Sequence, residues 1–427
     1  MAEEKKDSAK SFERHEPIVG LQEDLLGFSE LVPRFVEGLR ATKPPYVIGV
    51  IGEWGVGKTS FLKCVKKEIT QSKNFEVVGP IELFRFSRHM DLPAVLVSEM
   101  VDHFELKDSK VGKNLLRTLL AILSSLSLRI GSVNLDASEL TGKVRKIWRG
   151  TKEGLHKEFE ELVEEGLKEK KADKVIVMLD DIDRCLPNQA LELLETLRLF
   201  FDSSKVIFII AVDDGVIADA ITARFGKDVN INGHWYLEKL IDRRYRIPLP
   251  TSKQYIEFLN AQYKKITGED ISISKELKSK IEEFTANINP RRFLRAFENS
   301  VAMTDFYASG GLEDRKVSSL FLLLLREYSS ELYQLAGEYG EVIVALEKLK
   351  ELNVAKDEDE LRESRRNINE RYGDLGKKIS SDKTILDICY IICKLYREAS
   401  PRTVDERIAT AIKVSIDDIN RLTIPFL

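Results

Sequence analysis

The sequence predicts an α/β protein in which a parallel sheet flanked by helices is followed by further helical regions. Five short β-rich segments alternate with helical patterns in the first 250 residues. Two of these segments, VIVML at 175–179 and VIFIIAV at 206–212, are apolar at every position. Continuous apolar character is typical of parallel strands that are covered on both faces. Beyond Pro250 only helical periodicity continues.

The order of these signals predicts four parts. They are a tail and first helix (1–40), a sheet domain (41–250) with a helical insert at about 107–170, a helical lid (251–305) and an α-helical C-terminal domain (306–427). The predicted strands lie at 46–52, 75–86, 174–181, 204–214 and 242–250. The predicted lid helices lie at 252–268, 274–288 and 289–308.

The composition indicates a soluble protein. It has more than one domain, since 427 residues exceed the length that a single hydrophobic core usually supports. The formal net charge of −4 gives the chain no overall electrostatic attraction to nucleic acid or anionic membranes. The N-terminus is charged and lacks the apolar stretch of a signal peptide. The four cysteines form no CxxC pair, which fits a reducing compartment. We therefore expect a cytoplasmic protein. Cys389 and Cys393 are expected to pack in a core, with a metal or redox pair as the alternative.

The most apolar stretch, 114–135, is too short between charges to span a membrane. Arg117 and Arg129 leave eleven uncharged residues between them, whereas a spanning helix needs about 20. We expect no transmembrane segment. A buried helix and an amphipathic helix resting on a membrane or partner are the two interpretations of this stretch.

Residues 52–59, GEWGVGKT, fit the phosphate-binding loop of P-loop NTPases, with a predicted strand before and a predicted helix after. A loop that wraps a triphosphate turns its N–H groups inward, and side chains in place of its glycines would obstruct that approach. Lys58 is expected to act on the terminal phosphates and Thr59 to bind magnesium. The predicted nucleotide-binding residues are Gly52, Glu53, Trp54, Gly55, Val56, Gly57, Lys58, Thr59 and Ser60.

Three carboxylates, Asp180, Asp181 and Asp183, end a buried strand, where ligands of open α/β sheets bind. Because they repel one another, their clustering favours a divalent cation among them. We expect Asp180 to hold Mg²⁺ and Asp181 to orient or deprotonate the attacking water. The alternative is a strand end decorated with solvated acids.

Further polar residues are candidates for contact with a phosphate. Asp213 ends the next strand, where it either senses the terminal phosphate or caps the following helix. Pro290 starts a predicted helix, so Arg291 lies in a first turn where the helix dipole disfavours cations. We expect Arg291 to reach a phosphate if the lid folds over the nucleotide; a surface salt bridge is the alternative. Three arginines before the lid are either arginine fingers or charges on an exposed strand edge: Arg243, Arg244 and Arg246.

Together these segments resemble the KAP family of P-loop NTPases, signal-transducing ATPases related to the AAA+ class. The resemblance rests on 52–60, 180–202, 211–217, 236–241 and 289–299, and covers about residues 20–300. It implies ATP binding and hydrolysis coupled to a conformational switch, with Trp54 on the loop and Arg184 beside the acids. It also implies a link to plasmid and phage exclusion in prokaryotes. Membrane-spanning helices common in the family are not expected here, and FRFSR at 84–88 replaces the usual FNAWR.

Three functions are therefore open. In the first, the protein is an ATPase switch, and its C-terminal helices transmit the nucleotide state to a protein partner or to a second copy of the chain. In the second, a DNA-dependent ATPase uses the basic stretch 141–152 with Trp148. In the third, the nucleotide is purely structural, which the intact lysine, threonine and aspartates argue against.

Overall fold

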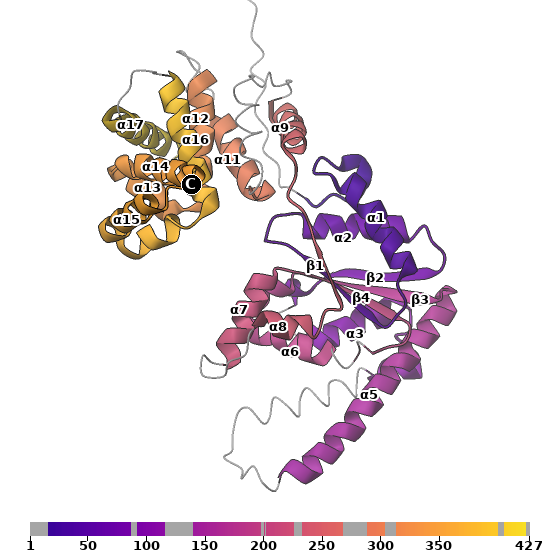
Figure 1. The fold of residues 1–427 in the computed structure, drawn as a ribbon. Helices are drawn as coiled ribbons and strands as arrows, with labels where there is room; N and C mark the ends of the chain where they lie inside the picture. The colour runs from indigo at the N-terminus through magenta and orange to yellow at the C-terminus, as the bar shows by residue number, and fades with distance from the viewer. Residues whose placement is uncertain are drawn as a thin grey trace, which may run out of the picture. The chain divides into compact units, whose positions relative to one another are not determined.

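The computed structural model describes residues 16–86, 92–115, 140–197, 200, 202–225, 233–267, 288–303, 313–399 and 405–423. These residues form two compact units, one over 16–248 and one from 249 onward. Figure 1 shows the sheet and its helices in the first unit and helices alone in the second.

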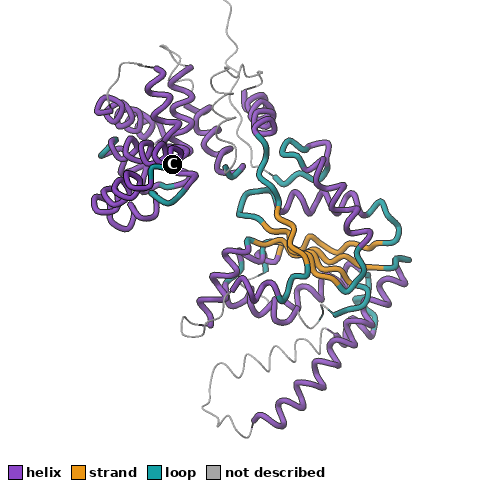
Figure 2. The backbone as a smooth tube through the Cα atoms, viewed as in Figure 1, coloured by secondary structure: helices purple, strands orange, loops and turns teal. Residues whose placement is uncertain are grey.

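The first unit is built on one five-stranded sheet with the order β2-β3-β4-β1-β5. Every pairing is parallel, as the apolar segments predict, and the strands run together through the unit in Figure 2. The strands are β1 (Tyr46–Ile51), β2 (Phe75–Glu82), β3 (Lys174–Asp180), β4 (Val206–Val212) and β5 (Arg243–Arg246). The predicted parallel sheet flanked by helices is confirmed.

Helices cover both faces of this sheet (Figure 1). On one face lie α1 (Phe28–Ala41) and α2 (Lys58–Ile69), and their rings Phe35 and Phe61 pack with Tyr245 of β5. On the other face lie α3 (Leu92–His103), α6 (Pro187–Leu197), α7 (Asp214–Phe225) and α8 (Gly233–Glu238). Burial on both faces explains why β3 and β4 carry no alternating polar positions.

The start of the first helix is set by a turn that precedes it. A 3-10 turn at Leu21–Glu23 precedes it, and the carboxylate of Asp24 accepts hydrogen bonds from the N–H groups of Leu26 and Ser29. These bonds hold the chain in a turn, so α1 starts only at Phe28.

The helical insert contains α5 (Leu140–Lys170), whose residues Phe159, Leu162 and Val163 join the core of the first unit. The apolar stretch 114–135 lies outside the described residues from 116 onward. None of the helices within the described ranges is both long and apolar enough to cross a bilayer.

The second unit is helical throughout its described part. Its helices are α9 (Ser252–Thr267), α11 (Pro290–Met303), α12 (Glu313–Tyr328), α13 (Ser330–Glu338), α14 (Glu341–Ala355), α15 (Glu358–Ile379), α16 (Lys383–Ala399) and α17 (Asp405–Thr423). One apolar core joins α9 and α11 to the later helices. The predicted boundary between lid and C-terminal domain, and the four-part division as a whole, stay predictions. The second predicted lid helix, 274–288, lies outside the described residues up to 287.

Cys389 and Cys393 are buried in this helical core as free thiols. Within the described ranges no group of three metal-ligating side chains is found. The burial of both thiols is what the packing interpretation predicts.

Candidate nucleotide-binding site

The loop between β1 and α2 has a backbone that only glycine accommodates easily. Gly55 and Gly57 both have φ of +97°, in the left-handed region that disfavours side chains. A Cβ on Gly57 would lie 2.8 Å from Cζ of Phe28, and one on Gly52 would lie 2.6 Å from Cγ2 of Val56. The loop is therefore tightly folded between β1 and α2.

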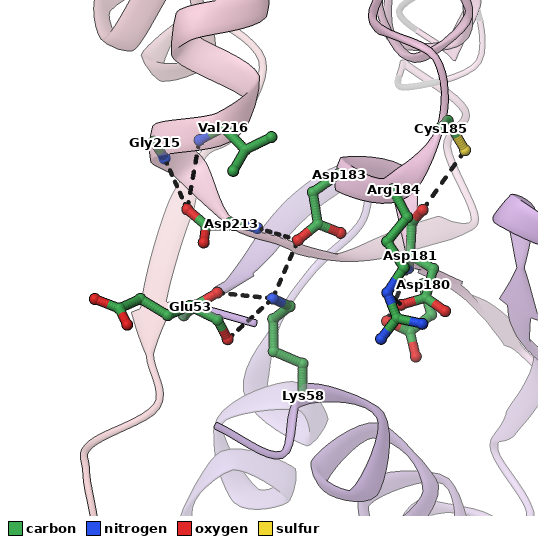
Figure 3. Close-up of polar contacts among 11 residues, drawn as sticks. Glu53, Lys58, Asp180, Asp181, Asp183, Arg184, Cys185, Asp213, Gly215 and Val216 are labelled. Carbon is green, nitrogen blue, oxygen red and sulfur yellow. Dashed lines mark hydrogen bonds and ion pairs between the residues drawn. The ribbon is translucent and has the colours of Figure 1, made fainter. Parts of the chain in front are cut away.

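Lys58, the first residue of α2, turns back into this loop. Its side chain is only 7% exposed. The ammonium donates hydrogen bonds to the carbonyl oxygens of Gly52 at 2.7 Å and Glu53 at 3.3 Å. It also pairs with Oδ2 of Asp183 at 3.2 Å. Figure 3 shows the lysine reaching these three oxygens.

Asp183 is the residue of the acidic run to which the sequence analysis gave no individual role. It lies in the 3-10 turn Ile182–Arg184 directly after β3, and its side chain is 6% exposed. Besides pairing with Lys58, its Oδ2 accepts a hydrogen bond of 3.0 Å from the N–H of Asp213. The sequence signal was present, since Asp183 is the third acid of the run, but its partners could not be read from spacing.

Asp180 ends β3 and is fully buried. Burial raises the pKa of its carboxyl, while a hydrogen bond from the Thr59 side chain, one from the Asp181 N–H and the charge of Lys58 lower it. The N–H bond to Oδ1 is 2.9 Å long. The structure thus brings Lys58, Thr59 and Asp180 together at the carboxyl edge of the sheet, although β4 lies between β1 and β3.

Two carboxylate oxygens in this cluster, Oδ2 of Asp180 and Oδ1 of Asp183, are buried and have no hydrogen-bond partner within the described ranges. A buried oxygen with no partner is costly. Carboxylate and hydroxyl oxygens are the ligands that Mg²⁺ prefers. Thr59 and Asp180 are therefore chemically suited to hold this cation.

Asp181 faces a different neighbour. Its backbone is left-handed, with φ of +61°, and its Oδ1 lies 3.0 Å from Nε of Arg184. Burial, followed by repulsion from Asp180, raises the pKa of the Asp181 carboxyl to about 6, although Arg184 lowers it. The Arg184 guanidinium in turn lies 5.7 Å from the ring centre of Trp54, which is 50% exposed. Trp54 and Arg184 thus connect the loop to the acidic cluster.

Asp213 follows β4 and its side chain caps α7. Its Oδ1 accepts hydrogen bonds from the N–H groups of Gly215 at 3.1 Å and Val216 at 3.4 Å, which satisfies donors of the first helical turn. The capping interpretation is therefore confirmed, and phosphate sensing stays a prediction. Ser60 lies in the first turn of α2 and Val56 is buried in the loop.

The arginines of β5 lie at the edge of the sheet, since β5 pairs with β1 alone among the described strands. Arg244 donates to the carbonyl of His234 at 3.2 Å, and Arg246 pairs with Asp214 at 3.0 Å. These contacts fit charges on an exposed strand edge.

Arg291 belongs to the helical unit. The Asn289 side chain accepts a hydrogen bond of 3.1 Å from the N–H of Arg291 and so caps the start of α11. The guanidinium of the neighbouring Arg292 lies 4.6 Å from the ring centre of Tyr328. Contact of Arg291 with a phosphate stays a prediction.

Comparisons with known proteins identify the family of the chain. The model of the KAP family P-loop domain matches residues 29–307. Among curated proteins, the kinase D-interacting substrate of 220 kDa from Rattus norvegicus and that from Homo sapiens are each 32% identical to the chain over 71 residues. The match covers 16% of this chain and only 4% of each relative. Because the family model spans well over half of the sequence, the chain belongs to the KAP family of P-loop NTPases.

Proposed function

We propose that the chain binds ATP with Mg²⁺ and hydrolyses it as a conformational switch. The observation that carries the proposal is the convergence of Lys58 and Thr59 with the fully buried Asp180, whose Oδ2 has no partner within the described ranges. A buried, partly unsatisfied carboxylate next to a phosphate-loop lysine is suited to a metal-bound polyphosphate.

The glycines, the lysine and the threonine of the loop each have a defined task in this proposal. The glycines let the backbone N–H groups approach the phosphates, and the start of α2 presents its positive end to the same anion. Lys58 binds the terminal phosphates, while Thr59 and Asp180 hold the cation. Mg²⁺, when bound, neutralises charge on the phosphate oxygens.

Asp181 is the proposed base. It accepts the proton of a water whose oxygen attacks the γ-phosphorus, and the bond between the γ-phosphorus and the oxygen bridging to the β-phosphate breaks to release ADP. The contact of Arg184 with Asp181 supports this role, because the guanidinium fixes the orientation of the carboxylate.

The helical unit is the proposed reader of the nucleotide state. Arg291 would contact a phosphate when the helical unit folds over the site, and hydrolysis would release it. The C-terminal helices would pass this change to a protein partner or a second copy. The family resemblance extends the proposal to a cytoplasmic role in prokaryotic defence against phage or plasmids.

Phosphate release by the purified full chain tests the proposal. Lys58→Ala should abolish ATP binding, because it removes the cation that meets the terminal phosphates. Asp181→Asn should retain ATP binding but lose hydrolysis. Asp202→Asn, which removes an exposed carboxylate of the same unit, is the matched control and should release phosphate at the wild-type rate. Normal turnover by Asp181→Asn would overturn the assignment of the base.

The same assay examines the DNA alternative. A basic helix that holds DNA should give ATP turnover that rises with added DNA and falls steeply with salt. Turnover that DNA leaves unchanged would remove that alternative.

A further inference from the structure

We propose that Asp183 is a positioning residue, the internal anion that holds Lys58 until nucleotide phosphates displace it, and that it links this exchange to the start of α7. The inference rests on the proposed function, since it concerns the same lysine. It concerns a carboxylate that binds neither metal nor nucleotide in that function.

The first observation is that Asp183 joins two strands that are not consecutive in the chain. It follows β3, yet its Oδ2 contacts Lys58 after β1 and the N–H of Asp213 after β4. All three groups lie at the carboxyl edge of the sheet, and Figure 3 shows the Asp183 carboxylate between them. At 6–7% exposure for both side chains, water screens the ion pair little.

The second observation is that the Lys58 ammonium has no spare donor. An ammonium has three N–H groups, and here three oxygens accept them: Gly52 O, Glu53 O and Asp183 Oδ2. A phosphate oxygen can accept a hydrogen bond from this ammonium only when one of the three present acceptors moves away. The two carbonyls are neutral, whereas the carboxylate has the same charge sign as the phosphate and is repelled. Asp183 is therefore the acceptor that must yield.

The third observation gives this exchange a consequence. The oxygen that pairs with Lys58 also accepts the N–H of Asp213, and Asp213 caps α7 through Gly215 and Val216. Withdrawal of Asp183 therefore removes the acceptor of the Asp213 N–H at the point where β4 becomes α7. Lysine, carboxylate and cap form a contiguous chain of contacts by which phosphate binding alters a helix end.

The binding test uses the full chain and a non-hydrolysable ATP analogue with Mg²⁺, titrated by calorimetry. Asp183→Asn keeps the shape of the side chain but removes the competing charge, so we expect the dissociation constant to fall about tenfold. Asp202→Asn is the control for loss of one negative charge and should bind as the wild type does. An Asp183→Asn protein that binds with unchanged or weaker affinity would overturn the proposal.

The coupling test measures amide hydrogen exchange over residues 213–217 by mass spectrometry. In the wild type, the analogue should accelerate exchange at these amides. In Asp183→Ala, which has no acceptor at this position, exchange should be fast from the start and the analogue should not change it. A wild-type response that persists in Asp183→Ala would refute the link to α7. A wild type that binds no nucleotide would instead defeat the proposed function itself.

Discussion

Replacement of Gly57 by alanine tests the conformation of the phosphate loop. The residue has φ of +97°, and holding a side chain in the left-handed region costs about 1–2 kcal/mol. The new Cβ would also lie 2.8 Å from Cζ and 3.3 Å from Cε2 of Phe28. Because Phe28 is buried at the start of α1, its ring has little room to move, and such overpacking costs about 1–3 kcal/mol. We expect Gly57→Ala to lower the free energy of unfolding by about 2–5 kcal/mol.

Urea unfolding followed by tryptophan fluorescence measures this change in the relevant unit. The chain has three tryptophans, Trp54, Trp148 and Trp235, and all three belong to the unit of residues 16–248. Gly38→Ala is the matched control, because Gly38 lies inside α1 and an added Cβ there meets nothing within 4 Å. Its alanine should stabilise the unit by about 0.5–1 kcal/mol. A Gly57→Ala protein within about 0.5 kcal/mol of the wild type would refute the described loop conformation.

Two further predictions follow from shifted pKa values. The pKa of the Asp181 carboxyl is raised from 3.8 to about 6 by folding. Between these pH values the folded state therefore binds one more proton than the unfolded state. The free energy of unfolding consequently falls as pH rises through this window. Without Mg²⁺ or nucleotide, the unfolding free energy of the wild type should drop by about 2 kcal/mol more than that of Asp181→Asn between pH 4 and 7. Parallel pH profiles would contradict this. Burial raises the pKa of the Cys64 thiol to about 11, so Cys64 should resist alkylation at pH 8 until the protein unfolds, as mass spectrometry of its peptide would measure. Rapid labelling of native protein at Cys64 would contradict its burial.

The sheet could be predicted because buried parallel strands need a continuous run of apolar residues. Residues 175–179 of β3 and all of β4 are apolar because helices cover both faces of the sheet. The loop of residues 52–59 could be predicted because its geometry needs glycines at fixed positions. Asp180 followed from a general rule that ligands bind at the carboxyl ends of parallel strands.

The partners of the acids could not be predicted in the same way. The contact between Asp183 and Lys58 depends on the 3-10 turn after β3 and on the order of strands, in which β4 separates β3 from β1. Neither is encoded in local spacing. Helical periodicity likewise predicts that α11 has an apolar face, but it does not predict which helix packs against that face. In the structure α11 packs against α12, which belongs to the predicted C-terminal domain.

The most direct test of the central claim is a crystal structure of the full chain with Mg²⁺ and a non-hydrolysable ATP analogue. We predict that the phosphates lie against the backbone of residues 52–59 with Lys58 on the terminal phosphate, and that Thr59 and Asp180 hold the Mg²⁺. Phosphates bound away from this loop, or a cation held without Thr59 and Asp180, would contradict the claim.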